Sequence, residues 1–487
     1  MSEAEDFVYS VEQVRLTETN FLLDRPGSES LMKKAGRAAL RRIRQCWPNA
    51  RTITIFCGAG NNGGDGYALA EEALRADYRV RVIAVSPPKT ADAQTHYQAY
   101  LSRSGEVSAD INAVLEDSDL LVDALLGIGF QGGLRKPYVT AIEVLNRSSV
   151  PALALDTPSG ICADTGKVGA VAVRAQVTLS FLGLKRGLVT GPALDYVGQV
   201  LTDDLDTDPQ SPWGEMITPA MVRQLQTDRP PSFHKGQAGH VGIVGGGEGM
   251  AGAAALCAEA TLRSGAGKVS VACHESAQEA VASHCPEIMV DVITDPGDLD
   301  RFLGRIDVLV VGPGMGQSAW SKMVFARCLE SSLPKVIDAD GLNLLAMGTD
   351  RPHDAVLTPH PGEAARLLGV SAREIEADRP AAVGELVSRY QSTTILKGAG
   401  TLIEGPALAT RVCDRGNPGM ASPGMGDTLT GAVAGLRGQG WSAFDSATLA
   451  VWFHATAGDL AARDVGSVGL VASDVIQRLA KVRKNLD

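Results

Sequence analysis

The stretch NPGMASPGMGDTLTGAVAGL, residues 417–436, joins a loop rich in glycine and proline to a single charged side chain, that of Asp427. Apolar residues follow at the spacing of an amphipathic helix, at Leu429, Ala432, Val433 and Leu436. Glycines and the free amides of a helix start suit a phosphate, whose charge a carboxylate would repel. Asp427 suits instead a base that takes a proton from a hydroxyl group attacking that phosphate. The alternative is an ordinary carboxylate that stabilises the helix dipole.

Other glycine-rich stretches follow apolar runs in the same half of the chain. LKGAGT (396–401) ends a predicted strand with a lysine and two glycines, which suits a nucleotide phosphate. VGPGMG (311–316) and TPHPGEAARLL (358–368) also end predicted strands. No Walker A sequence is present, so the pattern excludes a P-loop enzyme. A GxGD sequence with a phosphoryl-transfer base is typical of ribokinase-like enzymes.

The first half carries a different glycine motif, CGAGNNGGDGYALA at 57–70. Gly58, Gly60 and Gly63 form GxGxxG between a predicted strand and a predicted helix, which indicates a nucleotide-binding turn. A Rossmann dehydrogenase would place an acidic residue at the end of the next strand, but that strand ends VIAVSPP. The motif therefore disfavours a plain NAD-dependent dehydrogenase, and a tight turn that needs glycine is the alternative.

Polar side chains follow three predicted strands of the first half. Asn62, Asp123, Asp156 and Ser159 would converge if these strands are parallel, because their carboxyl ends would meet at one sheet edge. Their amide, carboxylate and hydroxyl oxygens suit a hard cation. Asp156 could alternatively act as a general acid or base. The plainer alternative is that these aspartates only cap helices.

Short β-branched runs alternate with helical patterns along the whole chain and predict an α/β fold. The predicted strands are 52–57, 78–85, 119–127, 151–156 and 176–181, then 239–246, 268–273, 306–314, 335–340, 355–360 and 393–398. Near-continuous apolar strands separated by helices indicate parallel sheets that are covered on both faces. The acidic, proline-containing stretch 201–216 places a domain boundary near residue 213.

Composition limits the partners. The chain has 487 residues and a net charge of −11 with no basic tail, which argues against nucleic acid or an anionic membrane as the main partner. The N-terminus has no secretory signal and no apolar run is long enough to span a bilayer. The eight cysteines include no CxxC pair, so we expect reduced thiols. A cytoplasmic protein is the prediction.

Over nearly its whole length the sequence resembles the bifunctional NAD(P)H-hydrate repair enzymes, in which an epimerase domain precedes an ADP- or ATP-dependent dehydratase domain. The motifs that carry the resemblance are GNNGGDGYALA, DALLGIG, DTPSGI, FLGLKRGLVTG, HKGQAGHVGIVGG, GMAGAAAL, VGPGMG, DADGLNLL, TPHPGEAARLLG, LKGAGT and NPGMASPGMGD. The resemblance implies a Rossmann-like αβα sandwich in residues 1–213, followed by a ribokinase-like α/β domain in residues 214–487.

By this resemblance the first domain interconverts the R and S forms of NADH or NADPH hydrated at C6 of the nicotinamide ring. Potassium would bind Asn62, Asp123 and Ser159, and Asp156 would be the catalytic residue. The residues expected to hold the hydrated dinucleotide in this domain are Asn61, Asn62, Gly63, Gly64, Asp65, Gly127, Ile128, Gly129, Phe130, Gln131, Gly132, Gly133 and Tyr138.

The second domain, by the same resemblance, dehydrates the S form at the expense of ADP with Mg²⁺, releasing AMP and phosphate. Asp427 would be the catalytic base, and Ala253, Gly316 and His360 would face the substrate. The residues expected to hold the adenine nucleotide are Lys397, Gly398, Ala399, Gly400, Thr401 and Gly426. The resemblance favours ADP over ATP, and we expect a homo-oligomer.

Two other functions compete with repair. A ribokinase-like kinase would leave the phosphoryl group on a small-molecule product, whereas repair would release free phosphate and NADH. The first half could also be a non-catalytic binding module attached to such a kinase. Epimer interconversion by the wild type distinguishes an enzyme from a module.

Overall fold

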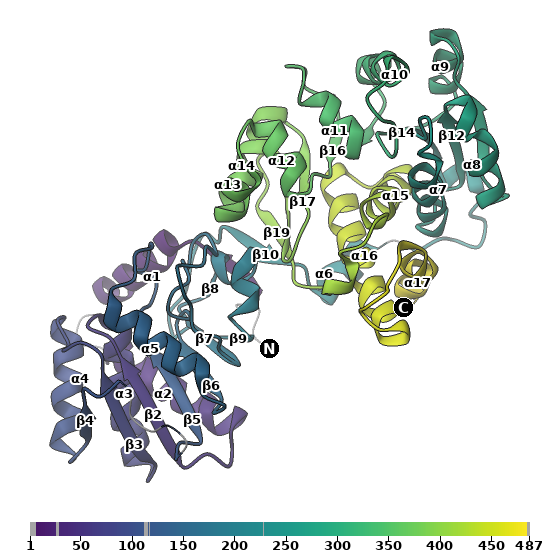
Figure 1. The fold of residues 1–487 in the computed structure, drawn as a ribbon. Helices are drawn as coiled ribbons and strands as arrows, with labels where there is room; N and C mark the ends of the chain where they lie inside the picture. The colour runs from purple at the N-terminus through teal and green to yellow at the C-terminus, as the bar shows by residue number, and fades with distance from the viewer. Residues whose placement is uncertain (1–5, 26–28, 112–114, 116, 227, 485–487) are drawn as a thin grey trace. The chain divides into compact units, whose positions relative to one another are not determined.

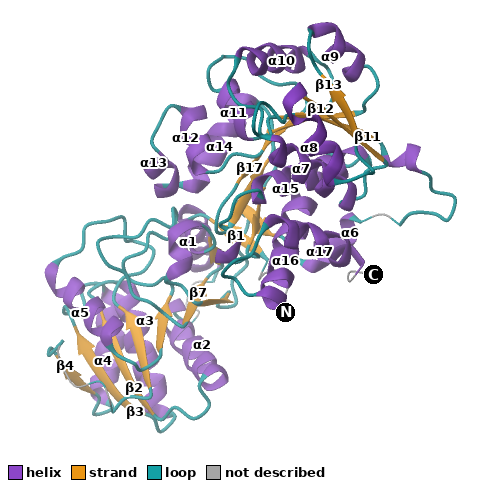
Figure 2. Cartoon of the chain, turned by 45° about the vertical axis from the view of Figure 1, so that its right-hand side comes forward, coloured by secondary structure: helices purple, strands orange, loops and turns teal. Residues whose placement is uncertain are grey.

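The structure is a computed structural model that describes residues 6–25, 29–111, 115, 117–226 and 228–484. The chain divides into two compact units, residues 1–215 and 216–487, close to the predicted boundary at residue 213 (Figure 1). Each unit contains strands flanked by helices (Figure 2). Among the described helices, none has the length and apolar character needed to cross a membrane.

The first unit is built on one parallel sheet. Its strands are β2 (Thr52–Cys57), β3 (Arg79–Ala84), β4 (Glu106–Ser108), β5 (Leu120–Ala124), β6 (Ala152–Leu155), β7 (Val177–Phe181) and β9 (Gln199–Asp203). They lie in the order β4-β3-β2-β5-β6-β7-β9, and every pairing is parallel. The chain thus builds one side of the sheet outward from β2 and then returns to build the other side from β5. This doubly wound order confirms the predicted Rossmann-like fold and places the topological switch point between β2 and β5.

Helices cover both faces of this sheet. The helices of the unit are α1 (Val11–Asp24), α2 (Leu31–Cys46), α3 (Asn61–Arg75), α4 (Ala91–Ser102) and α5 (Lys136–Arg147). Ile53 and Ile55 of β2 lie in a core cluster with α2 and α3, whereas Phe56 lies in a second cluster with α5. Alternate side chains of a strand point to opposite faces, so one apolar strand supports two helical layers.

Three short strands of the first unit pair outside the main sheet. They are β1 (Phe7–Tyr9), β8 (Leu184–Lys185) and β10 (Gly214–Met216). β1 runs parallel to β8, with Tyr9 opposite Lys185. It runs antiparallel to β10, with Phe7 opposite Glu215. The first strand of the chain is therefore paired with residues near the end of the unit.

The second unit has a larger sheet whose central strands are parallel. The strands are β11 (His240–Val244), β12 (Lys268–Cys273), β13 (Met289–Val292), β14 (Val308–Val311), β15 (Lys335–Ile337), β16 (Ala355–Leu357), β17 (Thr393–Leu396), β18 (Thr401–Glu404) and β19 (Thr410–Cys413). Their order is β13-β12-β11-β14-β15-β16-β17-β18-β19. Pairing is parallel from β13 to β17, and β18 and β19 add an antiparallel edge.

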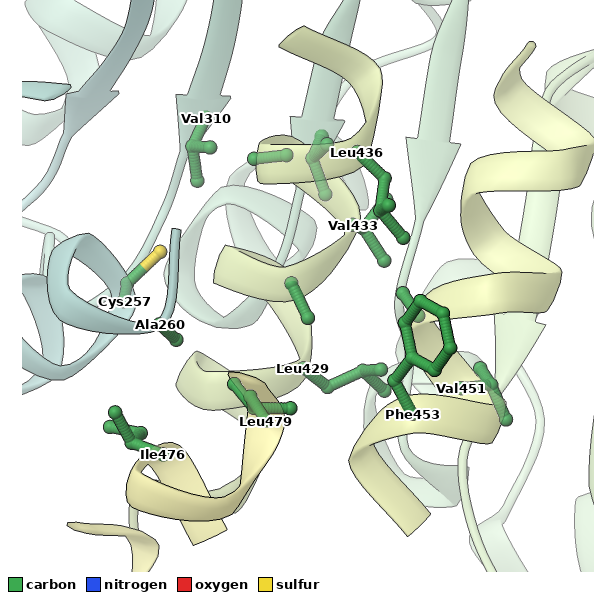
Figure 3. Packing of buried hydrophobic residues seen from close by; sticks show 14 of the residues in the cluster. Cys257, Ala260, Val310, Leu429, Val433, Leu436, Val451, Phe453, Ile476 and Leu479 are labelled. Carbon is green, nitrogen blue, oxygen red and sulfur yellow. The ribbon is translucent and has the colours of Figure 1, made fainter. Parts of the chain in front are cut away.

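The helices of the second unit are α6 (Pro219–Leu225), α7 (Ala251–Arg263), α8 (Gln278–His284), α9 (Pro296–Leu303), α10 (Ala319–Glu330), α11 (Ala339–Leu345), α12 (Pro361–Leu368), α13 (Ala372–Ala377), α14 (Arg379–Tyr390), α15 (Met425–Gly438), α16 (Ala443–Val465) and α17 (Ala472–Lys484). Residues of α7, α15, α16 and α17 share one core cluster with the inner strands (Figure 3). The four apolar residues that predicted the helix after Asp427 are all buried in this cluster, which confirms that prediction. The core therefore fixes the start of α15 relative to the strand ends.

Candidate functional sites

The glycine motif of the first unit forms the turn between β2 and α3. A Cβ atom at Gly58 would lie 1.8 Å from the carbonyl oxygen of Leu125, and one at Gly63 would lie 2.0 Å from the carbonyl oxygen of Gly58. A Cβ at Gly60, the N-cap of α3, would meet nothing within 4 Å. Gly58 and Gly63 are thus required for backbone packing, whereas the space beside Gly60 is open at the switch point.

Two predicted metal-binding residues are joined in one buried group. The Oγ of Ser159 donates to Oδ1 of Asp123 at 2.6 Å, and the Ser159 amide donates to Oδ2 at 2.7 Å. Burial raises the pKa of Asp123 to about 6, against the opposing effect of these hydrogen bonds. Asn62 is buried at the start of α3, and neither polar atom of its amide has a hydrogen-bond partner in the described part of the chain.

The donor set of these three residues suits a hard cation. Asn62 presents an amide oxygen that is buried without a protein partner, and Asp123 presents a fully buried carboxylate. Amide, carboxylate and hydroxyl oxygens form the donor set of a hard cation. The Asn62 amide is the observation that favours a bound ion, since an unpartnered buried amide is unfavourable.

Asp156 follows β6 and has left-handed backbone geometry, with φ of 65°. Its Oδ1 accepts a hydrogen bond from the ammonium of Lys185, whose side chain is fully buried. A Cβ atom at Gly127 would lie 3.1 Å from Oδ2 of Asp156 and 3.3 Å from Cβ of Asn62. The structure thus brings Asn62, Gly127 and Asp156 together from three strand ends, as the sequence predicted.

Two further carboxyl groups lie near Asp156. Burial and the charge of Asp156 raise the pKa of Asp65 well above its ordinary value, and the charge of Glu18 adds to this effect. Burial and the Asp156 charge also raise the pKa of Glu18, which lies on α1. Lys185 is the positive charge that counters this effect at Asp65. The Lys185 ammonium therefore acts on Asp156 and Asp65, and Arg15 is the cation that acts on Glu18.

The other predicted substrate residues of the first unit surround this group. Asn61 to Asp65 form the first turn of α3, and residues 127–133 form the loop between β5 and α5. A Cβ at Gly129, Gly132 or Gly133 would meet nothing within 4 Å, so this loop borders open space. Tyr138 is buried on α5, and its hydroxyl accepts a hydrogen bond from the Ala59 amide at 3.2 Å.

In the second unit, Lys397 at the end of β17 lies in a buried ionic network. Its ammonium donates to Oδ1 of Asp338 at 2.8 Å and lies 3.6 Å from Oε2 of Glu363. Thr430 of α15 donates to the other oxygen of Asp338 at 2.7 Å. Burial disfavours the charged forms of both residues. The ion pair between them outweighs burial, so the pKa of Asp338 is lowered and that of Lys397 is raised. Asp338 is therefore ionised and anchors both the lysine and α15.

Asp427 lies in the first turn of α15, beside this network. Gly424 is the N-cap and no side chain caps the helix start, so the first amides face the loop. A Cβ at Gly426 would lie 3.2 Å from the ammonium of Lys397, which brings these two predicted nucleotide residues together. Burial, with the charge of Asp338, raises the pKa of Asp427 to about 7. A carboxyl group with that pKa can exchange a proton at neutral pH.

A buried arginine supports the other predicted nucleotide residues. Residues 397–401 connect β17 to β18, and Thr401 donates from its hydroxyl to the carbonyl of Gly398 at 2.8 Å. Arg379 donates to the carbonyl groups of Leu396 and Lys397 at 3.1 and 3.2 Å. These hydrogen bonds fix the 397–401 loop at Lys397, whose ammonium takes part in the ionic network.

The predicted substrate residues of the second unit, Ala253, Gly316 and His360, follow strands β11, β14 and β16. His360 is the N-cap of α12, its side chain is half exposed, and its Nε2 lies 3.5 Å from Oε1 of Glu363. The amide of Gly316 donates to Asp340 at 2.7 Å, and Asp340 contributes to the raised pKa of Asp427. Ala253 lies in the first turn of α7, and a Cβ at Gly314 would lie 3.0 Å from its Cβ.

The sequence analysis assigned no role to several charged residues of these sites. They are Glu18, Lys185, Asp338, Glu363 and Arg379. Lys185, Asp338 and Glu363 lie in the motifs FLGLKRGLVTG, DADGLNLL and TPHPGEAARLLG, where a charged residue adjoins an apolar run. The adjoining apolar run was the feature of the sequence that could have indicated burial of these charged residues. Glu18 lies on an amphipathic helix without such a signal.

Comparison with known proteins gives a consistent result for both units. The family model described as "NAD(P)H-hydrate dehydratase" matches residues 241–481, and the model described as "YjeF-related protein N-terminus" matches residues 28–187. The second unit also resembles solved structures. The ADP/ATP-dependent NAD(P)H-hydrate dehydratase of Bacillus subtilis, co-crystallised with ATP and Mg²⁺, is 26% identical, with a TM-score of 0.51 over 56% of this chain and 98% of that chain.

A ribokinase-like protein of Enterococcus faecalis is 28% identical, with a TM-score of 0.51, and covers 56% of this chain and 95% of that chain. These matches confirm the ribokinase-like fold of the second unit. Full-length relatives extend the similarity to both units. The bifunctional NAD(P)H-hydrate repair enzymes of Coxiella burnetii and Vibrio cholerae are 39% and 40% identical, covering 97% of this chain and 98% and 97% of their own lengths. The chain belongs to the family of bifunctional NAD(P)H-hydrate repair enzymes.

Proposed function

We propose that this chain restores hydrated NADH and NADPH through two activities, with residues 1–215 epimerising the hydrate and residues 216–487 dehydrating its S form. The similarity to bifunctional repair enzymes spans both units and supports this pairing. It does not favour a small-molecule kinase with a non-catalytic first half. A cytoplasmic location and a homo-oligomeric state remain predictions.

In the first unit we assign hydrate binding to the start of α3 and to the 127–133 loop, with Asp156 as the catalytic carboxylate. Asn62, Asp123 and Ser159 would hold potassium, which when bound supplies positive charge beside the anionic dinucleotide. The open space at Gly60 and at the 127–133 loop supports this placement, since ligands of doubly wound sheets bind at the switch point.

In the second unit Asp427 would take the proton of the C6 hydroxyl group, whose oxygen attacks the terminal phosphoryl group of ADP. The O–P bond forms, the P–O bond to AMP breaks, and C6 then carries a phosphate. Phosphate leaves with its bonding electrons as the lone pair of the ring nitrogen moves toward C6, and C5 loses a proton to form the double bond of NAD(P)H. The amides at the start of α15 would stabilise the phosphoryl charge during transfer.

The adenine nucleotide would bind along Lys397 to Thr401 and at Gly426, with Ala253, Gly316 and His360 on the side of the hydrate. Lys397 lies beside Gly426 at the first turn of α15, where an ammonium favours phosphate. Magnesium would enter with the nucleotide and be held mainly by its phosphates. We propose ADP as the preferred phosphoryl donor.

The observation that carries the proposal is Asp427, a partly buried carboxyl group with a pKa of about 7 at a helix start beside a lysine. The test gives the purified chain a mixture of R and S NADH hydrates, with ADP or ATP, potassium and magnesium, and follows NADH absorbance. Recovery of nearly all NADH is expected. Recovery of only the S fraction would contradict the epimerase assignment, and a stable phosphoester without NADH would favour the kinase.

A further inference from the structure

Lys185 belongs to the FLGLKRGLVTG motif, and the function proposed above assigns no role to this motif. It ends the two-residue strand β8, opposite Tyr9 of β1, and its side chain has no exposed surface. Its ammonium donates to the carbonyl oxygen of Phe181 at 2.5 Å and to Oδ1 of Asp156. A lysine is almost never buried to this extent without partners that compensate its charge.

Another buried lysine of this chain, Lys335, is hydrogen-bonded to backbone carbonyls and to no carboxylate, although the charge of Asp354 acts on it from nearby. The ammonium of Lys335 donates to the carbonyl oxygens of Ser331, Leu333 and His353 at 2.6, 2.9 and 3.3 Å. A buried ion pair is moreover weak evidence of added stability, because desolvation offsets the attraction. The pairing of Lys185 with Asp156 therefore needs an explanation beyond burial of the lysine.

The geometry of Asp156 suggests that explanation. Its backbone is held in the left-handed region, and its amide donates to the carbonyl of Leu179 at 2.7 Å. With Oδ1 bound to Lys185, no donor among the described residues is bonded to Oδ2, which faces Gly127. The carboxylate side chain keeps 14% of its surface exposed. One oxygen is thus fixed and the other is directed to the loop that borders open space.

The Lys185–Asp156 ion pair also affects the electrostatics of the charged groups around Asp156. Asp65 and Glu18 both interact electrostatically with Asp156, and Lys185 is the cation that acts on Asp65 in the opposite sense. The ammonium of Lys185 thus offsets the repulsion between the Asp156 and Asp65 carboxylates, while Arg15 is the cation that acts on Glu18.

We propose that Lys185 is a positioning residue for epimerisation, which holds one oxygen of the Asp156 carboxylate and directs the other toward C6 of the hydrate. This inference rests on the proposed epimerase function. Asp156 takes the C6 hydroxyl proton, the oxygen forms a C=O bond, and the C6–N1 bond breaks with its electron pair on N1. N1 receives that proton from Asp156. Rotation of the open aldehyde and the reverse step give the other epimer, with no oxidant or reductant required.

The test measures epimerisation of R hydrate in the full-length chain, where the second unit converts the S product to NADH. We expect Lys185→Gln to lower the kcat of epimerisation roughly 100-fold, at the low end of what a general base contributes, with little change in KM. Lys185→Arg keeps the charge and should retain more activity. Because Lys185 acts through Asp156, Lys185→Gln should have no further effect in an Asp156→Asn background.

The controls separate this inference from folding and from the proposed function. Lys34→Gln removes another lysine of the first unit, one that bonds Asp206 and the Leu205 carbonyl, and should leave epimerisation unchanged. Dehydration of S hydrate should be unchanged in every variant. An inactive wild type would contradict the epimerase function itself. An unchanged kcat in Lys185→Gln, or an additive loss in the double variant, would overturn the positioning role.

If Lys185→Gln does not fold, as judged by thermal unfolding, Lys185→Arg provides the decisive comparison. Arginine keeps the ion pair but displaces the carboxylate, so kcat should fall about tenfold at constant KM, as expected for a lost transition-state interaction. A raised KM with the wild-type kcat would instead indicate a role in binding and would overturn the proposal.

Discussion

Asp338, which is buried, and Asp427, which is partly buried, are two carboxyl groups of one site whose pKa values are shifted in opposite directions. Burial acts on both, but Lys397 and Thr430 bond to Asp338 and lower its pKa, whereas the charge of Asp338 helps burial to raise that of Asp427 to about 7. This difference in pKa assigns the two roles. Asp338 is ionised and anchors Lys397 and α15, whereas Asp427 titrates near neutral pH and can transfer protons.

The pH dependence of dehydration should follow Asp427. A base must be deprotonated, so raising its pKa to about 7 means that its active form is lost as the pH falls through that value. We expect the kcat for S hydrate to fall about tenfold per pH unit below 7 and to level off above it. Initial rates of NADH formation between mildly acidic and mildly basic pH measure this. A profile with its midpoint near the ordinary pKa of an aspartate would contradict the assignment.

Asp427→Asn should abolish proton transfer while keeping the size of the side chain. Loss of a general base predicts a fall in dehydratase kcat of about 10² to 10⁴. Epimerisation of the R hydrate to the S hydrate by the same protein, followed by chromatography of the two epimers, should be unaffected. Loss of both activities together would indicate misfolding and not a lost base.

At the scale of elements, the turn between β2 and α3 contains one glycine that packing requires, Gly58, and another that borders open space, Gly60. Gly58→Ala places a Cβ 1.8 Å from the backbone oxygen of Leu125, which cannot rotate away. We expect a loss of about 1–3 kcal/mol or more in the unfolding free energy of the first unit. Denaturant unfolding and epimerase activity measure this effect.

The matched control is Gly60→Ala, whose Cβ meets no atom within 4 Å. This variant should lose less than about 1 kcal/mol of stability, the cost of alanine at an N-cap. If hydrate binds in the open space there, its KM for epimerisation should rise although the fold is retained. Equal stability of Gly58→Ala and Gly60→Ala would contradict the packing argument.

Sequence patterns predicted some of these strands and helices and missed others. The apolar strands β2, β3, β5, β6 and β7 and the helix after Asp427 were predicted, because each has a continuous run or a regular spacing. β1, β4, β8 and β10 were not, since strands of two or three residues have no periodicity. The meeting of Asn62 with Asp156 was predicted from parallel strand ends. The partner of Asp156 was not, because Lys185 enters from one of those short strands.

At the scale of the whole molecule, each unit has its own core and its own set of strand ends. Full-length Asp156→Asn and Asp427→Asn chains should therefore complement each other when mixed. Neither should convert R hydrate to NADH rapidly alone, and the mixture should restore conversion to near the wild-type rate at equal concentrations of intact sites. NADH formation from R hydrate measures this. A mixture far slower than wild type would indicate transfer of the S hydrate within one chain.

The pairing of β1 with β10 has a consequence for the order in which the protein forms. Phe7 is synthesised well before its partner Glu215, which is the last residue of the first unit. Such distant pairing must await closure of a long loop, which slows folding. The other partner of β1 is the strand that carries Lys185. A ribosome-bound chain that ends before residue 184 therefore contains Asp156 but not the lysine that orders it, so the epimerisation centre is completed late in the synthesis of the first unit.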